Sequence, residues 1–237
     1  MTDIKIQIES KSVLTMATIY FPKEFVKEIN DYIDKTTIPK NKDYAHLLVG
    51  QIRQDKKSAQ LDFPMDTEFG KKFKNVIENC ATKLLTDGFK RKLTAKAYEC
   101  WTVHSFSGDY NLLHDHGVEN NSTPIGMSSI LYLKVPDCIK ENAKKIMSTD
   151  GYLNLDHNNA SGDVDGFTQL IWGVTPRKEM LDLKHPTAEY IFPEEGKMLI
   201  FPHWLFHLVT PFFGKGERRT LSANFSCRGL PNEKQIS

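Results

Sequence analysis

The chain has 237 residues, 40% of them hydrophobic and 11% aromatic, which is the composition of a globular protein with a sizeable core and not of a disordered chain. Its 31 basic residues nearly balance 30 acidic ones, so the charge argues against nucleic acid or an anionic membrane as the main partner. The four cysteines are widely spaced and form no Cys-x-x-Cys pair, which excludes the usual zinc motifs and a dense disulfide framework.

Targeting signals are not evident in the sequence. Residues 1–7 alternate charged and apolar side chains and lack the apolar segment of a signal peptide. No run approaches the roughly 18 apolar residues of a membrane span. We therefore expect no membrane association and a reducing, cytoplasmic setting, which would be the host cytoplasm if the source is a virus. We also expect a single domain over residues 1–237.

The N-terminal part, residues 1–94, is expected to hold a strand and two helices. Residues 13–20 form a β-rich run, and Pro22 then opens a helix, because the missing N–H of proline has no intrahelical partner at that position. One face of this helix carries Phe25, Val26, Ile29 and Ile33. A second helix ends at Gly88 and carries apolar residues at three-and-four spacing: Phe69, Phe73, Val76, Ile77, Cys80, Ala81, Leu84 and Leu85. We expect both helices to buttress a sheet.

The sequence from residue 95 to residue 230 has a different character. Short apolar or alternating runs are separated by turn residues such as Ser107-Gly108-Asp109 and Gly214-Lys215-Gly216. Many short strands with such turns are typical of β-barrels and sandwiches. The expected strands are 95–106, 110–116, 127–135, 167–174, 188–192, 198–201, 207–211 and 218–226. We therefore predict a mainly β protein with flanking helices, an α+β fold.

The segment 156–165 combines three aspartates with Asn and His side chains and so raises the question of a calcium site. It lacks the EF-hand spacing, because the fifth ligand position is Ala160 and the sixth is Ser161 where that loop requires glycine. We expect a solvated loop here.

Two histidines in the segment 108–116 suggest a metal site. Residues two apart on a strand project to the same face, so His114 and His116 are expected to point together into the barrel, with Asp115 on the other side unless a bulge redirects it. Two neutral imidazoles suit iron, zinc, copper or nickel. Taken alone, the pair is a weak signal.

Later residues strengthen the signal. His207 can join the pair if its strand lies beside that of His114, and His203 is a competing ligand. On the following strand Arg218, Thr220, Ser222 and Asn224 share one face, a polar stripe that suits a dicarboxylate, because the guanidinium fork binds carboxylates bidentately. Arg219 competes with Arg218, and the alternating pattern favours Arg218 as the inward residue.

Taken together, these residues resemble the 2-oxoglutarate/Fe(II)-dependent oxygenase superfamily, in particular a prolyl-hydroxylase-like branch found in bacteria and phages. That branch shows a Trp, then Gly-x-Tyr-Asn-x-x-His-x-His, a strand ending in Pro, then Phe-Pro-x-x-Leu-x-His and an Arg-x-Ser/Thr strand ending in Asn. The matching residues occur in the same order: Trp101, Gly108, Tyr110, Asn111, His114, His116, Ser129, Tyr132, Pro136, Pro193, Gly196, Phe201, Pro202, Leu205, His207, Arg218, Thr220 and Asn224. The resemblance implies a double-stranded β-helix, a jelly-roll or cupin-like core, buttressed by the two N-terminal helices.

The resemblance also implies the roles of individual residues. His114, His116 and His207 would bind Fe(II), with His116 at the position where the superfamily usually has a carboxylate. Arg218 would bind the distal carboxylate of 2-oxoglutarate, helped by the hydroxyls of Tyr132 and Thr220. Candidate pocket residues are Asn111, Asn224 and Trp101. The implied activity is hydroxylation of a C–H bond of an unidentified substrate by O2, with release of succinate and CO2.

Two other functions fit the same histidines. A three-histidine cupin-type dioxygenase would act without 2-oxoglutarate and would not need Arg218. A barrel-shaped binding module would hold a structural zinc and show no turnover. The polar stripe that begins at Arg218 favours the 2-oxoglutarate-dependent oxygenase, since neither rival function requires it.

Overall fold

The computed structural model describes residues 4–11, 14–45, 59–117, 125–146, 164–173 and 187–229. All strand pairings within these residues are antiparallel and form two sheets. The seven-stranded sheet has the order β1 (Lys5–Lys11), β2 (Leu14–Tyr20), β9 (Lys197–Pro202), β6 (Gly126–Lys134), β11 (Arg218–Gly229), β4 (Leu93–Ser105) and β3 (Gln60–Asp62). The four-stranded sheet has the order β5 (Asn111–His114), β10 (Phe206–Val209), β7 (Thr168–Ile171) and β8 (Ala188–Ile191).

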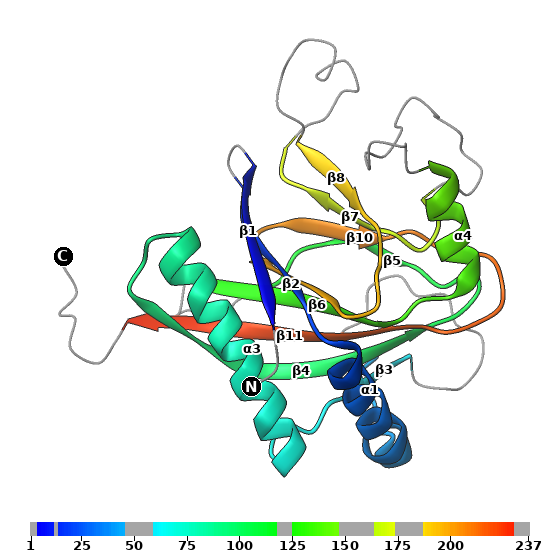
Figure 1. Cartoon of the computed structure of the whole chain (residues 1–237), viewed down its shortest axis with the longest axis horizontal. Coiled ribbons are helices and arrows are strands. Elements are labelled where there is room, and N and C mark those ends of the chain that lie inside the picture. Colours follow the sequence, from blue (N-terminus) through cyan, green and yellow to red (C-terminus); the bar gives the residue numbers. More distant parts are fainter. Residues whose placement is uncertain are drawn as a thin grey trace, which may run out of the picture.

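Helices cover one face of the larger sheet (Figure 1). They are α1 (Lys23–Tyr32), which continues through the π-helix η1 (Ile33–Thr37) into α2 (Ile38–Lys40), and α3 (Glu68–Lys83), which continues into η3 (Leu84–Gly88). The side chain of Thr67 caps α3 by accepting a hydrogen bond from the backbone N–H of Gly70. A further helix, α4 (Asp137–Ile146), follows β6. None of the described helices is long and apolar enough to cross a membrane.

The two faces of the larger sheet bury two separate hydrophobic clusters. One cluster lies under the helices and includes Phe25, Phe73 and Leu221. The other lies between the two sheets and includes Phe201 and Leu170. Because β6 and β9 are covered on both faces, their residues are buried almost continuously, and this explains why these two strands read as apolar runs in the sequence.

The predicted fold class is confirmed: the chain forms a double-stranded β-helix with helices packed on its larger sheet. The structure adds β1, β3 and α4, which we did not expect, and it shortens the strand predicted for 110–116, since β5 ends at His114. All four cysteines are free thiols. The segment considered for calcium, 156–165, lies outside the described residues except for its last two.

Candidate functional site

Two neighbouring strands of the smaller sheet bring the first and third histidines together. In the pairing of β5 with β10, His114 lies opposite His207 and Asn111 lies opposite Val209. The strand β5 therefore has one more residue than β10 in this interval, which makes a β-bulge at Leu112 and Leu113. The extra residue changes the alternation of side chains, so that Asn111 and His114, three positions apart, both face the same cavity.

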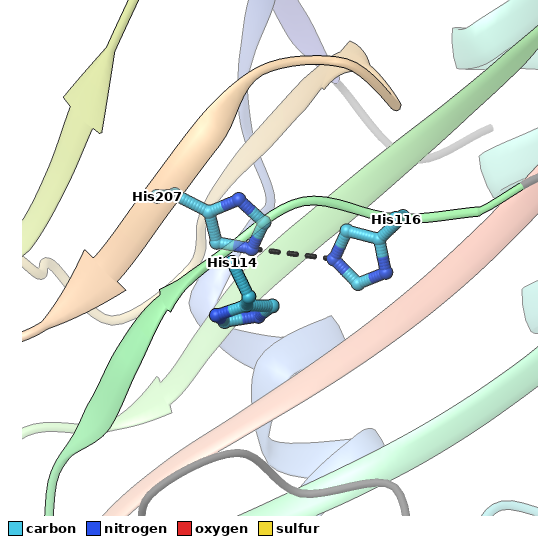
Figure 2. A group of neighbouring side chains, drawn as sticks. All are labelled: His114, His116 and His207. Atoms are coloured by element: carbon cyan, nitrogen blue, oxygen red, sulfur yellow. Dashed lines mark hydrogen bonds between the residues drawn. The ribbon is translucent and has the colours of Figure 1, made fainter.

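The segment that follows β5 positions His116. Its backbone N–H donates a hydrogen bond of 3.1 Å to the carbonyl oxygen of His203, so the turn after β9 holds it in place. The imidazole then turns back toward the other two histidines, as Figure 2 shows. The ring centroids lie 4.2 Å apart for His114 and His207, 5.0 Å for His116 and His207, and 5.5 Å for His114 and His116.

Backbone contacts orient two of the imidazoles. Nδ1 of His114 lies 2.6 Å from the carbonyl oxygen of Leu112, and Nδ1 of His207 lies 3.0 Å from that of Leu205. A carbonyl oxygen only accepts hydrogen bonds, so both Nδ1 atoms carry the proton and both Nε2 atoms keep a lone pair. Nε2 of His116 lies 3.2 Å from Nε2 of His207 (Figure 2).

Burial keeps two of the three histidines, His116 and His207, neutral. It lowers the pKa of His207 to about 3, and a positive charge on His114 would lower it further. Burial likewise lowers the pKa of His116 to about 2, with the neighbouring His207, His114 and His203 acting in the same direction. Neutral imidazoles are the form that binds metal ions, so these two side chains need no deprotonation at physiological pH.

The three side chains fit a transition-metal ion. One ligand atom from each of His114, His116 and His207 lies within 4.8 Å of the others. Two imidazole nitrogens that bind one ion at a right angle, each at roughly 2.1 Å, are separated by about 3 Å, which the spacing between His116 and His207 approaches. All three come from one side, which leaves the other positions around an ion open, as in the facial triads of non-haem iron oxygenases.

A cavity of about 430 Å³ lies between the sheets and contains these histidines. Its wall is formed on one side by alternate residues of β11 and β4, and on the other by β5 and β10. The β11 residues are those of the polar stripe: Arg218, Thr220, Ser222 and Asn224. The candidate pocket residues Trp101 and Asn111 also line it, together with Tyr44, Gln60, Tyr98, Glu99, Val103 and Asp115.

Arg218 is a buried cation with no acidic partner among the described residues. Only 2% of it is exposed. Its Nε donates to the carbonyl oxygen of Gly166 at 3.0 Å and its Nη2 to Oγ1 of Thr168 at 3.3 Å, both of which are neutral acceptors. Burial lowers the pKa of Arg218, because the protein interior disfavours the charged form of the guanidinium. A buried charge requires a counter-ion, so this end of the cavity is suited to a carboxylate ligand.

The Arg219 side chain points away from the cavity, and its guanidinium is bonded to acidic and amide side chains. Its guanidinium forms ion pairs with Glu217, at 2.9 Å, and with Asp34, at 2.7 Å, and donates to the side-chain oxygen of Asn30. The two adjacent arginines thus lie on opposite faces of β11, and only Arg218 lines the cavity.

Tyr132 lies beside Arg218 but does not line the cavity. Its hydroxyl donates to Oγ1 of Thr168 at 2.7 Å, and the centre of its ring lies 5.4 Å from the Arg218 guanidinium carbon. The same threonine accepts from both residues. In this arrangement Tyr132 contacts Arg218 through its ring, and its hydroxyl donates its hydrogen bond to Thr168.

Among the described residues, the other histidines and tryptophans lie outside the group of three. His203 is buried, and its ring centroid lies 6.0 Å from that of His116. His104 is buried, and its ring nitrogens contact the Thr102 hydroxyl and the Glu217 carboxylate. Trp172 packs against the cluster between the sheets, whereas Trp204 is half exposed.

Glu99 and Tyr44 line the cavity and were not predicted from the sequence. Glu99 shares the alternation of Trp101 and Val103 on β4, which could have indicated its position. Tyr44 lies in an irregular segment whose place beside β3 and β4 has no local sequence signal.

Comparison with known proteins agrees with this geometry. Residues 99–224 match the model of the family described as "Putative 2OG-Fe(II) oxygenase". No curated protein matches the sequence. Among solved structures, a prolyl-4-hydroxylase from Pseudomonas putida is similar, with a TM-score of 0.52, 12% identity and coverage of 97% of this chain and 94% of that one.

The protein HygX from Streptomyces hygroscopicus, in a structure with nickel and 2-oxoglutarate bound, is similar with a TM-score of 0.50, 12% identity and coverage of 89% and 82% of the two chains. The same protein with iron bound aligns at a TM-score of 0.50, 11% identity and coverage of 89% and 81%. At these identities the likeness concerns the fold. The family match spans just over half of the sequence, and on that basis the chain belongs to the 2OG-Fe(II) oxygenases, oxidoreductases that use ferrous iron and 2-oxoglutarate.

Proposed function

We propose that this protein is a hydroxylase that oxidises a C–H bond of its substrate. The reaction consumes one 2-oxoglutarate and one O2 and forms the alcohol, succinate and CO2. One oxygen atom of O2 enters the new hydroxyl group and the other enters the succinate carboxylate. When bound, ferrous iron and 2-oxoglutarate supply the oxidising chemistry, and the protein supplies ligation, orientation and exclusion of water.

One observation carries the proposal: a single cavity contains both the three clustered histidines and a buried arginine that has no acidic partner in the described part of the chain. His114, His116 and His207 would hold the iron through their ring nitrogens. Arg218 would bind the distal carboxylate of 2-oxoglutarate, with the Thr220 hydroxyl beside it. Metal ligands from β5 and β10 and an anion site on β11 would hold the two ends of one co-substrate.

Tyr132 would act as a positioning residue. Its ring and the Thr168 hydroxyl contact the Arg218 side chain, which limits the rotamers open to the guanidinium. This role differs from the direct hydrogen bond to 2-oxoglutarate that the resemblance implied, because that hydroxyl already donates to Thr168. Direct contact would require Tyr132 to exchange this bond for one to the co-substrate.

Arg218 distinguishes this function from its two rivals. A three-histidine dioxygenase that acts without 2-oxoglutarate, or a zinc-binding module, would have no need of a buried guanidinium facing the metal site across the cavity. Retaining an unpaired charge in the interior costs stability, so its presence favours an anionic ligand. We also propose a cytoplasmic setting and a single domain, with O2 and one further substrate as co-reactants.

The test is an anaerobic titration of the protein with Fe(II) and 2-oxoglutarate, followed by visible absorption. We expect a weak charge-transfer band when both are present. The Arg218→Lys variant, which keeps the charge but loses the bidentate fork, should need about tenfold or more 2-oxoglutarate to give the same band. The matched variant Arg219→Lys changes the same side chain on the opposite face of β11 and should leave the midpoint unchanged.

Product analysis completes the test. With O2 admitted, the wild-type protein should convert 2-oxoglutarate to succinate, and Arg218→Lys should do so with a raised KM. Tight zinc binding with no band and no succinate would contradict the proposal and favour the metal-binding module. Turnover of a substrate that does not depend on 2-oxoglutarate would favour the three-histidine dioxygenase instead.

A further inference from the structure

The end of the cavity away from Arg218 has a distinct chemistry. Along β11 the cavity-lining residues run from Arg218 to Asn224, and on the neighbouring strand Glu99 lies opposite Asn224. Six residues of β-strand span about 20 Å, so the Glu99 carboxylate is too far from the Arg218 guanidinium to neutralise it. The cavity therefore has a cation at one end and an anion at the other.

A β-bulge directs this part of β4 toward the cavity. The pairing with β11 shifts between Asn224, which faces Glu99, and Phe225, which faces Ala97, so Tyr98 is the extra residue. As a result both Tyr98 and Glu99 line the cavity, whereas Ala97 returns to the core under the helices. Bulges of this kind often redirect side chains next to active sites.

Hydrogen bonds hold the Glu99 carboxylate in one orientation. One oxygen accepts from the Tyr44 hydroxyl and the other accepts from the side-chain N–H of Asn224. The amide oxygen of Asn224 in turn accepts from the Ser128 hydroxyl. Burial, with the hydrogen bond to Glu99 as a second cause, raises the pKa of Tyr44, so Tyr44 remains a neutral donor.

No lysine or arginine side chain pairs with Glu99 among the described residues, and the two donors that contact its carboxylate are uncharged. Each carboxylate oxygen can accept a further hydrogen bond. A carboxylate fixed in a half-buried cavity wall, with both donors neutral, has the properties of a receptor for a cation.

A second feature of the same wall also indicates a ligand. Ser222 lies between Thr220 and Asn224 on the cavity face of β11 and is only 7% exposed. Its hydroxyl therefore borders the cavity, where a polar group of a bound molecule can reach it.

Trp101 forms the wall between Glu99 and the histidines. Its ring centroid lies 6.1 Å from that of His116 and 5.9 Å from that of Tyr44, on which it stacks. A flat aromatic wall next to an anion suits a side chain with an aliphatic stem and a charged head, because the stem packs on the ring while the head reaches the carboxylate.

We propose that this end of the cavity binds a cationic nitrogen group of the substrate, an amine or guanidine on an aliphatic chain, and that Glu99 is its counter-ion. The inference rests on the proposed function, since it assumes that the substrate enters the cavity that contains the three histidines. It adds the substrate class. The aliphatic chain that carries the cation would lie along Trp101 toward the metal site, and the oxidised carbon belongs to this chain.

The test measures binding of matched pairs of probes by calorimetry to the Fe(II)- and 2-oxoglutarate-loaded protein under anaerobic conditions. The pairs are lysine with norleucine and arginine with citrulline, each as the free amino acid and as the Nα-acetyl methylamide. At least one cation should bind about tenfold or more tightly than its neutral counterpart, and Glu99→Gln should abolish that preference. The blocked and free forms distinguish a peptide substrate from a small-molecule amine.

Two further variants serve as controls. Glu141→Gln removes one negative charge from the exposed surface of α4 and should leave the preference unchanged. Glu99→Asp keeps the charge and should retain part of the preference, which separates loss of charge from loss of structure. In all variants the affinity for 2-oxoglutarate should equal that of the wild type.

The outcomes separate the two proposals. If 2-oxoglutarate binds normally but neither cation binds more tightly than its neutral counterpart, the inference fails and the proposed function stands. A preference that survives in Glu99→Gln also contradicts the inference. If the wild-type protein binds no 2-oxoglutarate, the proposed function fails and the inference fails with it. The wild-type comparison needs no variant, so a misfolded variant does not remove the test.

Discussion

At the scale of single residues, the unusual feature is a ligand group made only of imidazoles. None of His114, His116 and His207 is a carboxylate, so the group of three carries no negative charge. Burial keeps His116 and His207 neutral. A ferrous site with three imidazoles is more positive by one unit than one with a carboxylate, and three imidazoles also suit zinc, copper and nickel.

Replacing His116 by aspartate tests its role as a ligand. We expect His116→Asp still to bind one metal ion per chain, with its preference for zinc over Fe(II) reduced by about tenfold, because a carboxylate is a harder ligand than an imidazole. Competition titrations with both ions measure the ratio. The control Asp115→Asn changes the neighbouring carboxylate, which lies outside the group of three, and should leave the ratio near the wild-type value. An unchanged ratio in His116→Asp would show that residue 116 does not bind the metal.

At the scale of strands and turns, the site depends on irregularities in otherwise regular pairing. Because of the bulge in β5, the side chains of Asn111 and His114 both point into the cavity. The bulge in β4 likewise directs the side chains of Tyr98 and Glu99 into it. The turn after β9 also positions a residue of the site, because the carbonyl oxygen of His203 accepts a hydrogen bond from the backbone N–H of His116.

Gly126 at the start of β6 is tied to this turn. A methyl group at this position would lie 2.1 Å from Nδ1 of His203, whose ring is 95% buried and has little room to move. We expect Gly126→Ala to destabilise the protein by about 1–3 kcal/mol, as overpacked cores do, and to weaken metal binding through His116. Urea unfolding and metal titration measure the two effects.

The double variant Gly126→Ala/His203→Ala provides the control. Removing the imidazole removes the clash, so adding Gly126→Ala to a His203→Ala background should cost far less than adding it to the wild type. Equal costs in both backgrounds would contradict the proposed contact.

At the scale of the whole molecule, the site joins the two sheets. The histidines belong to β5, β10 and the segment after β5, whereas Arg218 belongs to the larger sheet. A co-substrate bound to the metal site and to Arg218 would connect the two sheets across the hydrophobic cluster that lies between them. The site should therefore affect global stability as well as catalysis.

Ligand binding should consequently raise the melting temperature in two steps. Metal at 100 times its Kd contributes about 2.7 kcal/mol, and 2-oxoglutarate should add a second increment only when metal is present. Differential scanning calorimetry with Ni(II) in place of Fe(II) avoids oxidation. Arg218→Lys should keep the first increment and lose most of the second. A second increment without metal would indicate a separate binding site.

A buried ionic cluster joins the helical layer to the larger sheet. Glu217 accepts from His104 and Arg219, and Arg219 pairs with Asp34 of η1. Burial alone would raise the pKa of Glu217, but the hydrogen bonds from His104 and Arg219 outweigh it, and the pKa is lowered. A lowered carboxyl pKa stabilises the fold above the unfolded value and loses this effect as the pH falls.

We therefore expect Glu217→Gln to lower the free energy of unfolding of the metal-free protein by about 1–3 kcal/mol at pH 7. The difference from the wild type should stay constant down to the pKa of an unfolded glutamate, about 4.3, and shrink below it. Urea unfolding between pH 7 and pH 3 measures this. A difference that grows as the pH falls would contradict the assignment.

The sequence alone determined the fold class, the two buttress helices and the placement of His114, His116 and Arg218 in patterns that suggest a metal and an anion. The helices and the inward facing of Arg218 follow from local periodicity: alternate residues share a face of a strand, and apolar stripes mark a helix. His116 lies beyond the end of β5, so strand alternation between residues 114 and 116 does not place it. The alternation also assigns Arg218 and Arg219 to opposite faces of β11.

Only the tertiary structure decided how these elements meet. It brought His207 and not His203 into the group of three, paired the Tyr132 hydroxyl with Thr168, and buried His104 against Glu217. It also put Glu99 in the cavity wall beside Tyr44. Pairings between distant strands, and bulges that reverse the facing of side chains, depend on the packing of the whole chain, so no local pattern specifies them.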